Sequence, residues 1–165
     1  MATIGRSKHL LLTVRLLPRL AAIVACLVVP IGATADERRA RFNYMMNCQG
    51  CHQAGAQGLE GKVPQMKGFV GYFTRSEAGR KFLIQVPGSA TAPVNDEELT
   101  ELMNWILHTF SGEQLVDDFV PYTVSEVARL RRNVEADPVA RRDAILQSLA
   151  KRHDDLASAL TPTQQ

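Results

Sequence analysis

The sequence predicts an all-α protein, on two observations. Apolar residues recur at spacings of three and four between Leu99 and Phe110, the period of one face of a helix. Segments that begin with Ser, Thr, Asn or Asp beside a Glu or Pro mark several helix starts, while no strand pattern or internal repeat stands out. With 165 residues, of which 45% are hydrophobic, the chain has room for one compact domain and extensions.

Residues 1–35 are expected to be a signal peptide. A basic start precedes an apolar stretch over 20–33, and Ala33-Thr34-Ala35 is an A-x-A cleavage site, so the mature chain should begin near Asp36. The apolar stretch is shorter than the ~20 residues that span a bilayer, so we expect no transmembrane span after cleavage. A lipoprotein anchor at Cys26 is the less favoured alternative, because apolar residues continue beyond it.

The charge pattern argues against a nucleic-acid partner. Residues 1–35 hold four of the 19 Lys and Arg residues and none of the 17 Asp and Glu residues. The remainder therefore carries a small negative net charge, without the concentrated basic patch of a nucleic-acid-binding domain.

The first half of the expected mature chain consists of short helices and loops. Residues 38–47 suit a helix, and residues 53–67 contain the glycines and proline of an irregular loop. A capping box over 74–77 should open a helix that reaches about Gln85. The prolines at the ends of 87–93 predict a further loop.

The strongest helix starts at Asn95, and Ser111-Gly112 should end it. Residues 113–154 then form a helical extension, with helix starts at Thr123 and at Asp137-Pro138. Its apolar stripe should bury itself against the preceding domain, although a docking face is the alternative. That stripe consists of Val127, Leu130, Val134, Val139, Ile145, Leu146 and Leu149. We expect a disordered tail over 155–165.

Cys48, Cys51 and His52 form a CxxCH motif, which is typical of covalent haem attachment. Two thiols at this spacing share one side of a helical turn and can form thioethers with the two haem vinyl groups, while His52 can bind the iron as proximal ligand. The motif predicts one haem c and its iron. A thioredoxin-like dithiol is the competing interpretation, but it needs a βαβ context that this sequence lacks.

Around this motif the sequence resembles the class I, single-haem c-type cytochromes, over about 38–110. Ala40 and Tyr44 match a small residue and an aromatic of the family's N-terminal helix, residues 63–68 match its G-P-x-L-x-G segment, and Trp105 matches an aromatic of its C-terminal helix. The resemblance implies a small cytochrome c-like haem domain over 36–112, with the helical extension added to it.

The resemblance also gives Pro64 a role. Its carbonyl would accept a hydrogen bond from the second ring nitrogen of His52, which orients the ring and strengthens the ligand. The simpler interpretation is a proline that stiffens the loop.

The sixth iron ligand is open. Family members usually supply a methionine before the last helix, but residues 86–94 contain no strong axial donor, and Ala92-Pro93 stands where Met-Pro is expected. Met66 and Met103 are the candidates, each with core packing as the better supported role, and a vacant position is the third possibility.

The resemblance implies an electron-transfer protein without catalytic residues. We expect an exported, periplasmic carrier of single electrons, whose partners are a dehydrogenase, an oxidase or another cytochrome. The alternative is a five-coordinate haem protein that binds or senses NO or CO. A c-type peroxidase is disfavoured because such enzymes carry two haem motifs and this chain has one.

Overall fold

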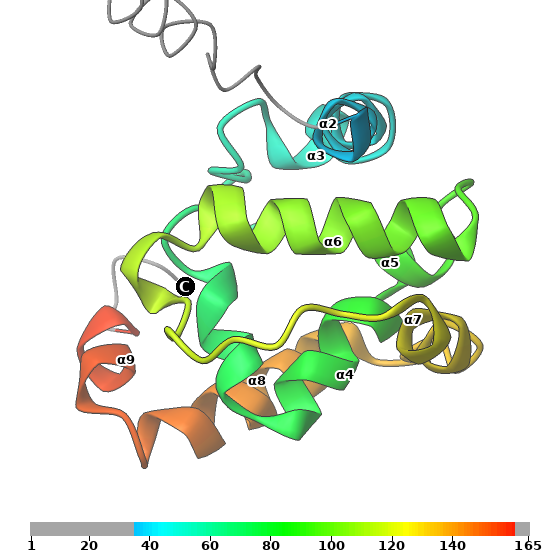
Figure 1. Ribbon diagram of the computed structural model, residues 1–165. Helices are drawn as coiled ribbons and strands as arrows, with labels where there is room; N and C mark the ends of the chain where they lie inside the picture. Colours follow the sequence, from blue (N-terminus) through cyan, green and yellow to red (C-terminus); the bar gives the residue numbers. More distant parts are fainter. Residues whose placement is uncertain (1–34, 161–165) are drawn as a thin grey trace, which may run out of the picture. The chain divides into compact units, whose positions relative to one another are not determined.

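The computed structural model describes residues 35–160, and Figure 1 shows that the regular elements in this range are helices. The expected signal peptide, with Cys26, and residues 161–165 lie outside it. The all-α prediction is confirmed over this range, where Leu59 and Val63 form one isolated bridge. The helices are α2 (Ala35–Asn47), α3 (Gln49–His52), η1 (Val70–Arg75), α4 (Glu77–Gln85), α5 (Pro87–Ala90), α6 (Asp96–Phe110), η2 (Gly112–Gln114), α7 (Val124–Leu130), α8 (Pro138–Ala150) and α9 (Asp154–Ala159).

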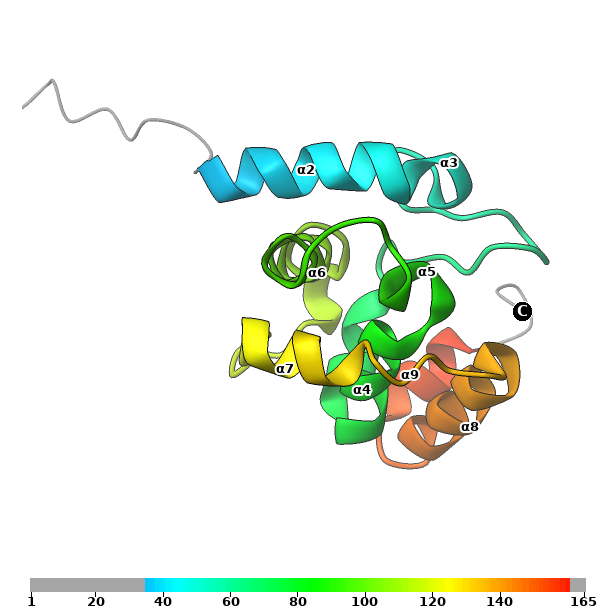
Figure 2. The same cartoon turned by 90° about the vertical axis from the view of Figure 1, so that its right-hand side faces the viewer.

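The crossing of α2 and α6 is the first packing unit of the domain. Figure 1 views α2 end-on and α6 from the side, and Figure 2 reverses the two views. Tyr44 of α2 lies 5.4 Å from Trp105 and 5.1 Å from Phe110, between ring centroids. Ala40 is buried on the same helix, and its small side chain permits a close approach of α2 and α6. The two aromatics that the family resemblance singled out, Tyr44 and Trp105, are therefore in contact where α2 and α6 cross.

Three helix starts lie where the sequence places them. The Asn95 side chain accepts a hydrogen bond from the Glu98 N–H at 2.9 Å, and the Glu98 carboxylate accepts one from the Asn95 N–H. Thr123 and Asp137 cap α7 and α8 in the same way, through side-chain oxygens. Each cap satisfies an N–H that the helix leaves without a partner.

Two predictions in the middle of the chain are wrong in part, although the helix expected to reach Gln85 does end at that residue. Helix α4 begins after Ser76, whose hydroxyl accepts from the Gly79 N–H, because Thr74 belongs to the tighter turn η1 and donates to the Gly71 carbonyl. The segment 87–93 is not all loop: Pro87 fills the first position of α5, where its missing N–H costs no helical hydrogen bond.

The helices that follow Gly112 pack against the earlier ones, with α7 on α4 and α6 and with α8 on α4 and η1. Five residues of the predicted stripe are buried, whereas Val134 and Val139 are 48% and 70% exposed, so the predicted burial of these two is wrong. Val134 lies in the connection between α7 and α8, and Val139 occupies the first turn of α8.

One arginine of the extension holds the segment between α5 and α6. Arg131 donates to the carbonyls of Ala90, Ala92 and Val94 at 3.2, 3.0 and 2.9 Å. It also donates to the Asp96 carboxylate at 3.0 Å. One charged side chain thus ties the end of α5, the connection that follows it and the first turn of α6 together.

The predicted disordered tail is wrong for residues 155–160, because Asp154–Ala159 forms α9. Leu156 is fully buried, and Asp155 accepts from Arg75 at 2.8 Å. A core contact and a charged hydrogen bond together hold this helix. Among the described helices, none combines the length and the apolar character needed to cross a membrane.

Candidate functional site

The CxxCH motif forms the single turn α3 directly after α2. The His52 N–H donates to the Cys48 carbonyl at 2.9 Å, and the Cys51 N–H donates to the same oxygen at 3.2 Å. The Tyr44 hydroxyl donates to the Gln53 carbonyl at 2.6 Å, where Gln53 ends the turn with a left-handed φ of 68°. The aromatic residue of α2 therefore fixes the end of the motif turn as well as the contact with α6.

The loop after the motif folds back onto His52. The Gly58 N–H donates to the His52 carbonyl at 3.0 Å, with Gly58 at a φ of +68° that favours glycine. The loop then brings the Pro64 carbonyl oxygen to 3.2 Å from His52 Nδ1. The contact expected between His52 and Pro64 is present, and with Nδ1 as donor the neutral ring keeps Nε2 free to bind a metal.

Side chains of the motif and of distant helices surround one cavity of about 240 Å³. We call its motif side the ligand wall: Cys48, Cys51, His52, Pro64, Gln65 and Met66. The apolar wall comes from η1, α4, α5 and α6 and consists of Val70, Phe73, Phe82, Leu83, Val86, Gly88, Ser89, Met103 and Ile106. Asn47 and Arg142 complete the lining.

The residues of this cavity fit a haem c. A macrocycle needs an apolar enclosure, and hydrocarbon side chains form most of the apolar wall. Thioether attachment needs two unlinked thiols, and Cys48 and Cys51 are both free at the edge of the cavity. Burial lowers the pKa of His52, which favours the neutral imidazole that binds iron. The thiols, the imidazole and the apolar enclosure are therefore all compatible with a covalently bound haem.

The same observations weaken the dithiol interpretation. The first thiol of a CxxC redox pair normally has a lowered pKa, because the thiolate is the reactive form. Burial and the neighbouring Cys51 raise the pKa of Cys48 to about 11. The described residues also contain no βαβ unit around the motif.

The methionines divide into two groups. Met66 and Met103, the two candidate ligands, both line the cavity, and Met103 is the more deeply buried. Met45 and Met46 are 51% and 66% exposed and do not line it. The segment 86–94 reaches the cavity with Val86, Gly88 and Ser89, none of which is a strong axial donor.

Arg142 is the cavity residue that sequence reasoning missed. It stands three, four and seven positions before Ile145, Leu146 and Leu149, so it shares the buried face of α8. A charged residue on a buried helical face was the available signal, because such a residue usually has a specific partner.

Comparisons with known proteins agree with the site. The chain is similar to cytochrome c-552 of Thermus thermophilus, with 32% identity over 102 residues that cover 51% of this chain and 78% of the relative. It has the same identity to a second cytochrome c-552 of Thermus thermophilus, of which 69% is covered. No protein-family model and no solved structure matches the chain.

The similarity extends over most of each relative, and the motif and the cavity are those that covalent haem requires. The chain belongs to the c-type cytochromes, electron-transfer proteins that carry covalently bound haem c with its iron.

Proposed function

We propose that this protein is an exported single-haem electron carrier whose haem is bound by Cys48, Cys51 and His52. The observation that carries the proposal is the placement of all three side chains on the cavity, with His52 Nδ1 against the Pro64 carbonyl. Cys48 and Cys51 would form the thioethers, His52 would be the proximal ligand, and Pro64 would hold the ring in its ligating tautomer.

The arrangement suits the transfer of single electrons. Haem, when bound, supplies an iron that takes up and releases one electron. The apolar wall excludes water from that iron, and the thioethers prevent loss of the group. Cys51 is exposed, so the attachment edge of the cavity lies at the protein surface, where a redox partner can approach.

Haem staining after denaturing electrophoresis tests the attachment. The wild-type band should stain, and a Cys48→Ala, Cys51→Ala double variant should lose the stain, because only a covalent link survives denaturation. Cys26→Ala is the matched control and should still stain, since this cysteine lies in the proposed signal peptide. An exported, unstained wild-type protein with a redox-active dithiol would instead identify a thiol oxidoreductase.

The location and partners belong to the same proposal. We propose cleavage of residues 1–35 near Asp36, a haem domain over 36–112 and an extension over 113–154. The mature protein would work in the periplasm, between a dehydrogenase as donor and an oxidase or another cytochrome as acceptor. Mass spectrometry of the exported protein tests the cleavage, and a first residue far from Asp36 contradicts it.

A second candidate function is the binding or sensing of NO or CO at a five-coordinate iron. It is favoured by the segment 86–89, which brings Val86, Gly88 and Ser89 to the cavity where a ligand methionine would be expected, and by Arg131, which binds the carbonyls of Ala90 and Ala92 directly after it. The absorption spectrum of the reduced protein, with and without CO, separates the two functions. Ready CO binding favours the sensor, and an unchanged spectrum favours the carrier.

Substitutions of the two cavity methionines refine that test. If a protein ligand fills the sixth position, Met66→Leu or Met103→Leu should remove the magnetic-resonance signal of an iron-bound methionine methyl and permit CO binding. Ser89→Ala is the control from the segment 86–94 and should leave the spectrum unchanged. A changed spectrum in Ser89→Ala would contradict the prediction that this segment supplies no ligand.

A further inference from the structure

Arg142 is a largely buried cation of the extension whose one carboxylate contact among the described residues is long. Its side chain is 24% exposed, and its nearest carboxylate is that of its own neighbour Asp143, at 3.9 Å. The guanidinium lies 5.4 Å from the centre of the Phe69 ring and makes none of the hydrogen bonds found in residues 35–160. Burial lowers the pKa of this group, yet an arginine stays protonated near neutral pH.

The other buried arginines of the described chain are fully engaged, which makes Arg142 unusual. Arg80 donates twice to the Glu126 carboxylate, at 2.7 and 2.8 Å, and Arg131 donates to three carbonyls and one carboxylate. A largely buried cation whose one carboxylate contact is long, and whose N–H groups make no hydrogen bond, is costly, so the position of Arg142 indicates a further partner that is not part of the polypeptide.

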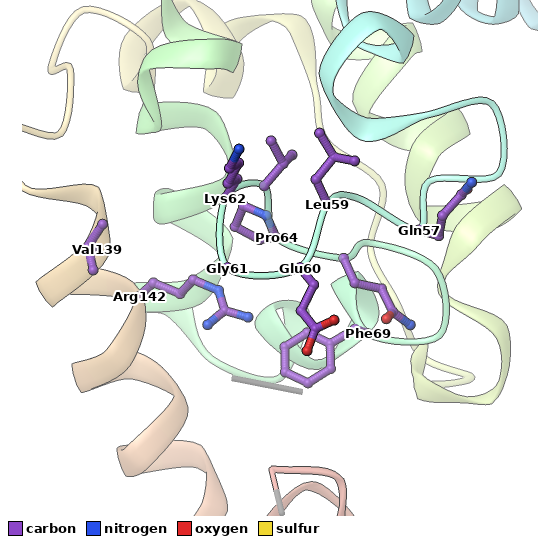
Figure 3. Close-up of a pocket in the computed structure, with 11 residues that line it drawn as sticks. Gln57, Leu59, Glu60, Gly61, Lys62, Pro64, Phe69, Val139 and Arg142 are labelled. Carbon is purple, nitrogen blue, oxygen red and sulfur yellow. The ribbon is translucent and has the colours of Figure 1, made fainter. Parts of the chain in front are cut away.

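Arg142 stands at the border of two cavities. Besides the haem cavity, it lines an outer cavity of about 450 Å³ together with Glu60, Lys62 and Val139, and the two cavities share Pro64, Gln65 and Arg142. Figure 3 shows the Arg142 side chain reaching from α8 toward the loop that carries Pro64. An anionic group at the edge of an apolar ligand would lie at such a border, where polar side chains replace hydrocarbon.

The border between the two cavities is also suitably placed for a haem propionate. Figures 1 and 2 are related by a turn about the vertical axis, and in both α3 lies near the top of the described domain and α8 near the bottom. The helix that carries Cys51 and the helix that carries Arg142 therefore lie at opposite ends of the described domain, although both residues line the cavity. The two vinyl groups that form thioethers and the two propionates lie at different edges of a haem, so attachment through Cys48 and Cys51 would leave the propionates free to reach residues away from α3.

We propose that the Arg142 guanidinium binds a propionate carboxylate of the haem, so that the C-terminal extension supplies part of the haem site. The inference rests on the proposed attachment through Cys48 and Cys51. A carboxylate would pair with the forked donors of the guanidinium, as in other Arg–carboxylate contacts. Asp143 and Glu60 are the nearby competing anions, but Asp143 remains at 3.9 Å and Glu60 makes no ion pair with Arg142.

The test compares two arginines that are neighbours on α8. Arg142→Gln and Arg141→Gln each remove one positive charge, but Arg141 is 47% exposed and does not line the cavity. The midpoint potential of the haem-loaded protein is measured for both and for Arg142→Lys. A cation beside a propionate favours the added electron, so Arg142→Gln should lower the potential several times more than Arg141→Gln, and Arg142→Lys should recover most of the difference.

Equal shifts in Arg142→Gln and Arg141→Gln would overturn the inference. If Arg142→Gln fails to mature, a crystal structure of the haem-loaded wild type decides: a guanidinium nitrogen should lie about 3 Å from a propionate oxygen, and an Arg142 that faces solvent rejects the contact. Haem staining separates the two proposals. Absence of covalent haem in the wild type rejects the attachment itself, whereas a stained protein with equal shifts rejects only the role of Arg142.

Discussion

The two walls of the haem cavity are built in opposite ways. The ligand wall comes from one short stretch of chain, and hydrogen bonds within that stretch hold it, such as that from the Gly58 N–H to the His52 carbonyl. The apolar wall is assembled from η1, α4, α5 and α6, and contacts with the extension brace it through Arg80 and Arg131. The chemistry of the site is therefore encoded locally, whereas its enclosure depends on the whole fold.

The largest effect is expected from the ligand wall itself. His52→Ala should abolish normal maturation, because it removes the proposed proximal ligand, and no other described histidine lines the cavity. His108→Ala is the matched control, since His108 is exposed in the last turn of α6. Absorption of the purified protein measures haem content, and a normal haem spectrum in His52→Ala would contradict the assignment.

Gly58→Ala should destabilise the ligand wall by about 2 kcal/mol or more, measured by denaturant unfolding of the haem-loaded protein. A Cβ at Gly58 would overlap the Val63 carbonyl and lie 2.9 Å from the Pro64 oxygen, at a φ of +68°. Gly61→Ala is the control, because Gly61 has a similar φ of +67° but no atom within 4 Å of a Cβ. If both variants lost the same unfolding free energy, backbone strain alone would explain the effect.

Pro64→Ala tests how the loop supports the His52 imidazole, because the variant keeps the backbone carbonyl that accepts the imidazole hydrogen bond. The pyrrolidine ring of Pro64 restricts the loop, so the variant should keep its haem attached but change the midpoint potential or the ligand-field bands. Val63→Ala is a neighbouring control outside the haem cavity. If Pro64→Ala leaves both properties unchanged, the support proposed for His52 loses its basis.

The smallest effect is expected at the brace of the apolar wall. The hydrogen bond from Arg80 holds the pKa of Glu126 below its usual range. A lowered folded-state pKa contributes stability above the unfolded pKa, and this contribution is lost as the pH falls through the folded value. Glu126→Gln should therefore be less stable than the wild type by about 1 kcal/mol near pH 7, with a smaller gap in acid.

Unfolding measured across the acid range in high salt checks this expectation. Glu77→Gln is the control: its exposed pair with Lys81 also lowers the pKa of Glu77, but salt screens it, so the variant should match the wild type. A stability gap for Glu126→Gln that stays constant with pH would show that packing, rather than the ionised pair, is responsible.

The contrast between the walls explains what the sequence could predict. The attachment motif and the caps at Asn95, Thr123 and Asp137 depend on neighbours within a few positions, so their residue types are informative. The His52–Pro64 contact was reachable only through the family resemblance, because its partners are twelve positions apart in an irregular loop.

Features that depend on distant partners were missed. The end of α5 is stabilised by Arg131, which donates to the carbonyls of Ala90 and Ala92. Helix α9 is stabilised by the burial of Leu156 in the core and by the hydrogen bond from Arg75 to Asp155. Neither partner is visible in the local pattern. The role of Arg142 was not predicted for the same reason, because the loop over 57–65 that surrounds it is far away in the sequence.

The position of α8 has a consequence for the order of events during biogenesis. A chain is synthesised from its N-terminus, so the attachment turn α3 emerges long before Arg142. Until α8 has been synthesised, the cavity lacks Arg142, a border residue that it shares with the outer cavity. The thiols and the apolar wall are therefore present in the chain before the residue that separates the haem cavity from the outer cavity. A chain that ends before α8 would retain the attachment turn and the apolar wall but lack this border.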